Sequence, residues 1–300
     1  MSMPPGVRRL PLEAGVYRFR DDAGRILYIG RATQLRARVA SYWSDLRDRP
    51  RLRRMVPLVT GVEAVVCDSV HEAAWLEHNL LTRRKPRWNR TRGGQESTVH
   101  IGLDAGSAAP GLRVIYTPAA GCFGPYLGGT RARQAVSALH RIRPLAYTGA
   151  RLTGAELELA AKRGITPADR EALAASVAAI LRREPAAIAA AREDLTALRD
   201  RASAGLSFEL AAEIHEELHA LDWITSPQRV SSLKPVGLRA AGWADGQLVI
   251  FTVRQGRLDE WTRRPCTEAR AQRYLAATPA EWRNFAARAA ELAATLETAA

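Results

Sequence analysis

The sequence predicts an α+β protein in three parts. These are a small domain with a short antiparallel sheet flanked by helices, a mostly helical middle, and a small β-meander with a C-terminal helix. Two β-rich runs, 15–20 and 25–30, flank Asp21-Asp22-Ala23-Gly24, a loop composition typical of hairpins. Helix start and stop signals fill the middle third. Three strand-like runs follow, with turns at Asp245-Gly246 and Gln255-Gly256.

The first part is predicted to continue from the hairpin into a helix, a third strand and a second helix. Apolar residues recur every four positions in 34–43, which indicates a helix. Residues 62–68 alternate like a strand. The capping-box pattern of 69–72 then opens a helix that must end before Pro86.

The remaining elements are mainly helical. A short strand is predicted within 111–126. Further helices are predicted over 131–143, from Thr153, from Thr166, over 187–202, over 208–221 and from 278–281. Two of them, 187–202 and 208–221, would pair around Gly205. Their shared apolar stripe would consist of Leu195, Leu198, Leu206, Phe208, Ile214, Leu218 and Leu221.

Charge and composition narrow the possible functions. The 300 residues include 44 Lys plus Arg against 31 Asp plus Glu, a formal charge of +13. This excess fits a polyanionic partner, DNA or RNA, or else an ordinary basic surface. No apolar run is long enough to span a membrane. The three distant cysteines exclude a disulfide framework and a four-cysteine metal site, and without a secretion signal we expect a cytoplasmic protein.

The first candidate catalytic residues lie in the first hairpin. If its loop closes with Arg20 opposite Arg25, Tyr17 lies directly across from Tyr28, with Cβ atoms about 5 Å apart. Two adjacent phenols could simply stabilise the sheet as a cross-strand pair, or they could belong to a site.

The segment after the hairpin adds cations to the phenols. Arg31 and Arg38 lie two helical turns apart, and Tyr42 follows Arg38 by one turn. Guanidinium groups beside phenols can bind a phosphate and supply proton donors and acceptors. An exposed basic helix face is the alternative interpretation.

These residues resemble the GIY-YIG nucleases. Gly15-Val16-Tyr17, Tyr28-Ile29-Gly30 and Arg38 match the family pattern in order. Glu77 and, twelve residues later, Asn89 occupy its remaining positions. The similarity is greatest to the N-terminal half of UvrC, the bacterial nucleotide-excision-repair endonuclease.

The resemblance implies a metal-dependent phosphodiesterase. Glu77 would hold a single divalent cation, Mg²⁺ or Mn²⁺, because one carboxylate plus waters suits Mg²⁺ better than Zn²⁺. Arg38 would clamp the phosphoryl oxygens. Tyr28 would act as the base and Tyr17 would orient the attacking water, or the two would exchange roles. Neighbouring cations, among them Arg31, would have to lower the tyrosine pKa.

The same resemblance implies roles for two further residues. Tyr42 would hydrogen-bond the phosphate, and Asn89 would fix the backbone near the metal.

The chain also departs from the family pattern. Arg31 stands where the family usually has lysine. The stretch 145–154 contains no cysteine, so no iron–sulfur cluster is expected.

The similarity to UvrC continues beyond the nuclease segment. Cys122-Phe123-Gly124-Pro125-Tyr126 resembles the segment after it, and 206–214 resembles the UVR motif through which UvrC contacts UvrB. The motif could instead pack on its own chain, and His215-Glu216 replaces the usual Arg-Asp. Residues 237–262 resemble the opening strands of the RNase H-like domain of UvrC, without its carboxylates. This organisation resembles Cho, the shorter homologue that makes only the 3′ incision.

The sequence thus predicts four segments and one function. The segments are a nuclease domain over 1–96, a UvrC-type linker over 97–165, a helical region with the UVR-like hairpin over 166–230, and an α/β remnant over 236–300. The function that the resemblance implies is a single 3′-side incision near a lesion in damaged duplex DNA. Alternatives are a partner-independent flap or branch nuclease and a non-catalytic UVR adaptor. The DNA contacts are expected from Arg47, Arg49, Arg51, Arg53 and Arg54.

Overall fold

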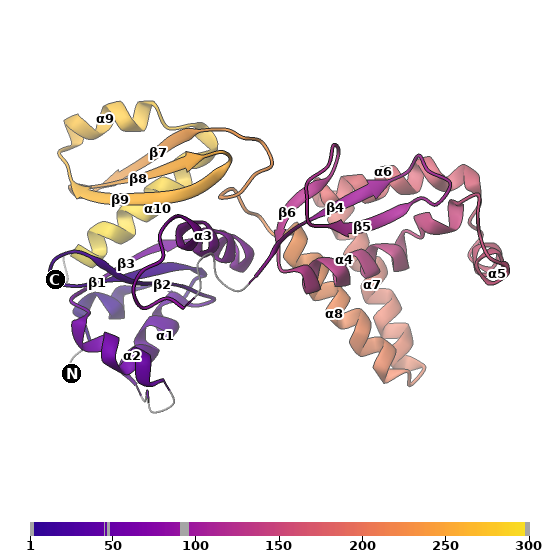
Figure 1. Ribbon diagram of the computed structural model, residues 1–300, viewed down its shortest axis with the longest axis horizontal. Helices are drawn as coiled ribbons and strands as arrows, with labels where there is room; N and C mark the ends of the chain where they lie inside the picture. Colours follow the sequence, from indigo (N-terminus) through magenta and orange to yellow (C-terminus); the bar gives the residue numbers. More distant parts are fainter. Residues whose placement is uncertain (1–2, 45, 47–48, 91–95, 298–300) are drawn as a thin grey trace. The chain divides into compact units, whose positions relative to one another are not determined.

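Contacts between residues divide the chain into two units, which are considered separately. The computed structural model describes residues 3–44, 46, 49–90 and 96–297. One unit comprises Met1–Gln95 with Pro227–Ala300, and the other comprises Glu96–Ser226 (Figure 1). The predicted first and last segments therefore share a unit, and the predicted middle segments lie mainly in the other. The α+β class, the helical middle and the C-terminal meander are confirmed.

The predicted hairpin and third strand form an antiparallel sheet in the first unit, with β1 between β2 and β3. The strands are β1 Gly15–Arg20, β2 Ile26–Ala32 and β3 Gly61–Val66. The helical segments around this sheet are η1 Pro5–Arg9, α1 Leu35–Ala40, η2 Ser41–Trp43, α2 Pro50–Met55, η3 Val56–Leu58 and α3 Val70–Arg83. Because β2 is an outer strand, its outward backbone groups need partners from elsewhere in the chain.

The predicted register of the hairpin was wrong. Tyr17 lies opposite Gly30, and Phe19 lies opposite Tyr28, with an irregularity after Phe19. The loop closes differently because the Asp21 side chain accepts a hydrogen bond from the backbone N–H of Arg25 at 2.8 Å. Tyr17 is therefore diagonal to Tyr28, and its ring covers a glycine instead of another ring.

The meander forms a second antiparallel sheet in the same unit. Its elements are β7 Leu238–Ala244, β8 Gln247–Arg254, β9 Arg257–Pro265, α9 Glu268–Ala276 and α10 Ala280–Glu297. Asp245 and Gln255 adopt φ values of 43° and 49°, as tight hairpin turns require. Helix α10 contacts β7, β8 and β3 and so joins both sheets of the unit (Figure 1).

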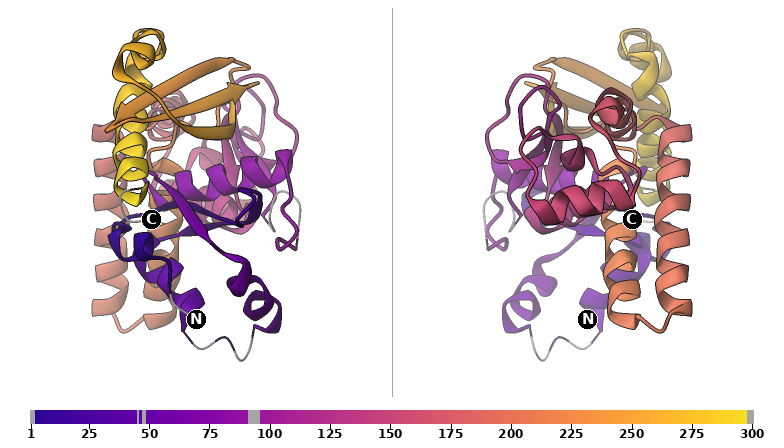
Figure 2. Two further views of the ribbon diagram at one scale, coloured as in Figure 1. Left: turned by 90° about the vertical axis from the view of Figure 1, so that its left-hand side faces the viewer. Right: turned by 90° about the vertical axis from the view of Figure 1, so that its right-hand side faces the viewer.

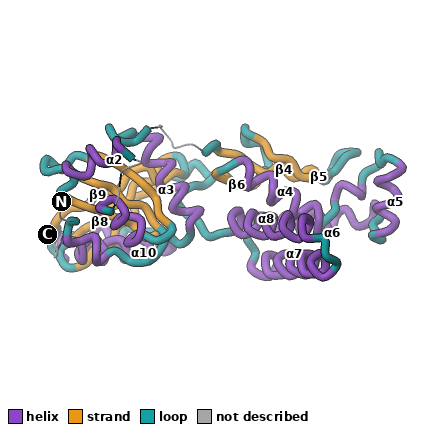
Figure 3. Tube along the Cα trace, turned by 90° about the horizontal axis from the view of Figure 1, so that it is seen from below, coloured by secondary structure: helices purple, strands orange, loops and turns teal. Residues whose placement is uncertain are grey.

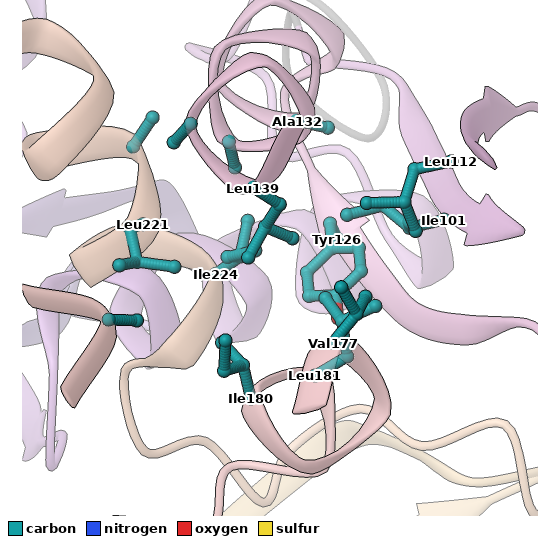
Figure 4. Close-up of a cluster of buried hydrophobic side chains, with 14 of the residues drawn as sticks. Ile101, Leu112, Tyr126, Ala132, Leu139, Val177, Ile180, Leu181, Leu221 and Ile224 are labelled. Atoms are coloured by element: carbon teal, nitrogen blue, oxygen red, sulfur yellow. The ribbon is translucent and has the colours of Figure 1, made fainter. Parts of the chain in front are cut away.

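The second unit combines a three-stranded sheet with the helical middle. The strands β4 Thr98–Asp104, β5 Gly111–Ile115 and β6 Phe123–Leu127 are ordered β5-β4-β6. The helical segments are α4 Gly129–Ile142, η4 Leu145–Thr148, α5 Gly154–Lys162, η5 Pro167–Asp169, α6 Arg170–Leu181, α7 Pro185–Ala204 and α8 Phe208–Thr225. Tyr126, Leu139, Val177, Ile180 and Leu221 meet in its core (Figure 4).

Helices α7 and α8 form the predicted hairpin and lie side by side (Figures 2 and 3). Ile214, Leu218 and Leu221 are buried as expected. Leu206 and Phe208, by contrast, are 74% and 64% exposed, so this end of the predicted apolar stripe is not buried within the chain. Both lie at the turn where α7 ends and α8 begins, outside the buried cluster to which Ile214, Leu218 and Leu221 belong. Among the described residues, no helix has the length and apolar character needed to cross a bilayer.

Candidate active site

Three tyrosines meet on one face of the first sheet. Tyr17 comes from β1, Tyr28 from β2 and Tyr42 from η2. The hydroxyls of Tyr17 and Tyr42 are 2.7 Å apart, within hydrogen-bond distance. The ring centroids of the three residues are 6.0 to 6.3 Å apart. Tyr17 and Tyr42 are buried, whereas Tyr28 is partly exposed, so Tyr28 is the most accessible phenol of the cluster.

Gly30 makes room for this cluster. A Cβ atom at Gly30 would lie 2.5 Å from the Tyr17 hydroxyl and 2.8 Å from Cε1 of Tyr28. Phe19 completes the packing, with its ring centroid 5.0 Å from that of Tyr42. Neither contribution is evident from the sequence, in which Gly30 counts only as part of a motif. Only the pairing of residues across β1 and β2 would have indicated that Gly30 and Phe19 lie beside the tyrosines.

We expect Gly30→Ala to lower the free energy of unfolding by about 2 kcal/mol, because the added methyl group must displace two packed rings. Urea unfolding of the full chain measures this change. Gly61→Ala is the matched control on β3. The atom nearest to its new Cβ is the Cβ atom of Arg20, which is 3.9 Å away. Equal stability of the two variants would show that the rings are loosely held.

The free edge of β2 is where the acidic and amide side chains lie. Asn89 accepts a hydrogen bond from the Ile29 N–H at 3.0 Å and donates one to the Ile29 carbonyl at 2.8 Å. One Glu77 carboxylate oxygen accepts a hydrogen bond from the Arg31 N–H at 3.2 Å. The other lies 3.5 Å from Nε of the same arginine. These contacts provide hydrogen-bond partners for the outward backbone groups of β2. They also place Glu77, from α3, beside the tyrosine cluster.

Arg38 approaches the cluster from the last turn of α1. Its guanidinium carbon lies 5.5 Å from the centroid of the Tyr42 ring. The structure therefore brings together the seven residues that the sequence assigned to catalysis and to the metal, from β1, β2, α1, η2, α3 and the segment after α3. They are Tyr17, Tyr28, Arg31, Arg38, Tyr42, Glu77 and Asn89.

The electrostatics of the cluster differ from the sequence-based expectation. Burial raises the pKa of Tyr17 well above its usual value, and its phenolic neighbours raise it further. Burial, Tyr42 and the Glu77 charge raise the pKa of Tyr28, and Arg38 opposes them only in part. The expectation that nearby cations lower the tyrosine pKa is therefore wrong, because burial outweighs the effect of Arg38. Both phenols keep their protons at neutral pH.

The residues present fit a hard divalent cation. Glu77 is partly accessible, with 20% of its side chain exposed, and it lies beside the phenols. One carboxylate with room for water ligands is the donor set that suits Mg²⁺ or Mn²⁺. Across residues 3–44, 46, 49–90 and 96–297, no three or more His, Cys, Asp or Glu side chains gather as a metal-binding group. The cysteines Cys67, Cys122 and Cys266 are all unpaired.

The predicted DNA-contacting arginines surround α2. Arg49, Arg51, Arg53 and Arg54 are exposed, whereas Arg47 lies outside the described residues. The Arg51 guanidinium donates a hydrogen bond to the backbone carbonyl of Arg87 at 2.7 Å. The accessible guanidinium groups could contact phosphates without rearrangement of the core.

Comparison with known families decides the identity of this domain. The family model described as a UvrC-like GIY-YIG domain matches residues 13–90, which contain the whole cluster. Residues 13–90 are a UvrC-like GIY-YIG domain. The resemblance noted in the sequence is thereby confirmed.

Several known proteins are similar to the GIY-YIG domain and to more of the chain. UvrABC system protein C of Trichlorobacter lovleyi is 32% identical over 150 residues, 49% of this chain and 25% of the relative. That of Syntrophotalea carbinolica is 27% identical over 271 residues, 83% of this chain and 44% of the relative. The chain thus spans less than half the length of these relatives.

A solved structure is also similar to the GIY-YIG domain. It is the N-terminal endonuclease domain of UvrC from Thermotoga maritima, described as bound to its catalytic divalent cation, magnesium. The identity is 31%, covering 28% of this chain and 91% of that one, with a TM-score of 0.26.

Proposed function

We propose that this chain is a metal-dependent DNA endonuclease of the UvrC type, which makes one incision on the 3′ side of a lesion in damaged duplex DNA. The observation that supports it is the meeting of three phenols, the Arg38 guanidinium and the Glu77 carboxylate at the free edge of β2. This set provides proton acceptors, a cation for the phosphate and a metal ligand in one place.

Each residue of the cluster has its own role in phosphodiester hydrolysis. Arg38 binds the phosphoryl oxygens, and Tyr42 donates a hydrogen bond to the same phosphate. Tyr17 orients the attacking water, and the phenolate form of Tyr28, the more accessible of the two, takes a proton from that water and becomes the neutral phenol. A divalent cation held by Glu77 would supply a Lewis acid for the leaving oxygen. Burial, Tyr42 and the Glu77 charge raise the pKa of Tyr28, so a cation held by Glu77 would favour the Tyr28 phenolate, which acts as the base.

The supporting residues hold this arrangement. Asn89 fixes Ile29, and the Arg31 N–H fixes Glu77, so both tie the edge of β2 to α3 and the segment after it. The Arg31 guanidinium also lies beside the Glu77 carboxylate and would have to share it with the metal. We therefore assign Arg31 and Asn89 to positioning, within the set of site residues.

The partner of this nuclease would be UvrB. The tip of the α7–α8 hairpin exposes Leu206, Phe208 and Leu210, which are 74%, 64% and 40% accessible. Apolar side chains grouped in this way on an exposed turn favour docking to another protein. UvrB would also supply the lesion recognition that the cluster itself does not provide.

The test is cleavage of a lesion-bearing duplex with each strand labelled in turn, with Mg²⁺ or Mn²⁺, and with or without UvrB. We expect one metal-dependent nick, on the 3′ side of the lesion, that requires UvrB. Cutting of flap or junction DNA at the same rate without UvrB would instead indicate a partner-independent nuclease. UvrB binding without any cleavage would indicate an adaptor.

Phosphate binding by the arginines around α2 predicts a strong salt dependence of DNA affinity. We expect the double change Arg53→Gln/Arg54→Gln to weaken binding to all DNA sequences alike. Log affinity falls linearly with log salt, and this decline should become less steep in the variant. The magnitude of the slope should decrease by about 0.9 for each phosphate that the variant no longer neutralises. Fluorescence anisotropy at several salt concentrations measures both effects. Arg270→Gln, on the exposed side of α9, is the control, and an equally large decrease in this variant would argue against a specific basic surface.

A further inference from the structure

Two histidines on α8 are unused by the proposed mechanism and lie one helical turn apart. His215 and His219 are both exposed, on the side of the helix away from the buried Ile214 and Leu218. Their imidazole centroids are 4.4 Å apart with the rings nearly perpendicular, and their Nε2 atoms are 3.1 Å apart. His215 is also the position where the sequence departs from the usual UVR pattern.

The Nε2 separation matches that of two ligands on one metal ion. With metal–nitrogen bonds of about 2.0–2.1 Å, adjacent ligands lie roughly 2.9 Å apart in an octahedral site and about 3.3 Å apart in a tetrahedral one. The observed 3.1 Å falls between these values. The same two atoms could instead share one N–H···N hydrogen bond, which would need no metal.

The charges around the pair are mixed. Residues 208–225 contain five acidic side chains and no lysine or arginine, but Arg141 of α4 pairs with Glu213 and Glu217, and Arg192 of α7 pairs with Asp222. Glu216, next to His215, is exposed. Imidazole ligands select borderline transition metals such as Zn²⁺, Ni²⁺ and Cu²⁺ over Mg²⁺, so the site would differ in metal class from Glu77.

We propose that His215 and His219 form a chelating site for a borderline divalent transition metal on α8. The two Nε2 atoms bind the ion, and water fills the remaining positions, so the ion is exchangeable. Binding joins two turns of the second helix of the hairpin and stabilises them. This proposal does not depend on the proposed nuclease activity.

The test is calorimetric titration of the full chain, prepared without a polyhistidine tag, with NiCl₂. Ni²⁺ is the better probe because the partly exposed thiols of Cys122 and Cys266 also attract Zn²⁺. We expect at least tenfold weaker binding in His215→Gln and in His219→Gln. Hydrogen exchange should slow in wild-type α8 on addition of Ni²⁺, and it should not change in either variant.

A spacing control keeps the number of histidines constant. In the double variant Glu216→His/His219→Gln, the two imidazoles are adjacent in sequence and point to different sides of the helix, so it should bind Ni²⁺ as weakly as the single variants. Wild-type affinity in this variant or in either single variant would overturn the proposal. Unchanged exchange in wild-type α8 would also overturn it, leaving only a hydrogen-bonded imidazole pair.

Discussion

Replacing Glu77 with glutamine should slow cleavage of lesion-bearing DNA by roughly a hundredfold or more, which is the scale of removing a charge-stabilising group. Glutamine has the same size, and its carbonyl oxygen can still accept the hydrogen bond from the Arg31 N–H. What it removes is the negative charge that would hold the divalent cation. DNA affinity should therefore stay close to that of the wild type, because the arginines around α2 are untouched.

The measurement is the single-turnover nicking rate at saturating UvrB, with affinity measured separately. Glu13→Gln is the matched control, because Glu13 is an exposed carboxylate of the same unit and pairs with Arg288 at 2.9 Å. Raising the Mn²⁺ concentration should restore little of the rate, since the ligand itself is gone. Cleavage by Glu77→Gln at the wild-type rate would refute the assignment of the metal to this carboxylate.

Tyr28→Phe should also reduce the rate roughly a hundredfold, the effect expected when a general base is removed while its ring remains. Burial and the Glu77 charge raise the pKa of Tyr28, so only a small fraction is phenolate at neutral pH. At pH values below the pKa, this fraction grows about tenfold for each unit of pH increase. The wild-type rate should therefore rise between pH 7 and pH 9, and this rise should be missing in Tyr28→Phe.

Comparing the tyrosines assigns their roles. Tyr116→Phe is the control, because Tyr116 is 64% exposed and belongs to the second unit. Tyr17→Phe keeps the ring over Gly30 but removes the hydroxyl that bonds Tyr42, so it should lower the rate and preserve the rise with pH. Absence of the pH dependence in Tyr17→Phe, with retention in Tyr28→Phe, would show that the two phenols exchange the roles proposed here.

Local signals in the sequence are enough to place most elements. Ser69 is predicted to cap a helix, and its hydroxyl does accept a hydrogen bond from the Glu72 N–H at 2.9 Å. The turns at Asp245 and Gln255 are predictable because Gly follows each of them and the chain needs positive φ there. Such signals depend on neighbouring residues alone.

Features that depend on distant parts of the chain are harder to predict. The hairpin register follows from the way Asp21 binds the Arg25 backbone and from the space over Gly30, neither of which composition reveals. Leu206, in the turn before α8, and Phe208, its first residue, belong to the predicted apolar stripe, yet they remain exposed. The candidate site was predicted better than the register, because the spacing of Arg38, Glu77 and Asn89 matched a family pattern as a whole.

The most direct test of the central claim is anomalous scattering from crystals of this protein soaked in Mn²⁺. The claim is that Glu77 and the tyrosine cluster form one metal-dependent site. It predicts an anomalous peak beside the Glu77 carboxylate, on the side facing the hydroxyls of Tyr17 and Tyr28, and no such peak in Glu77→Gln crystals. A wild-type crystal with Mn²⁺ bound elsewhere and Glu77 still paired with Arg31 would contradict the claim.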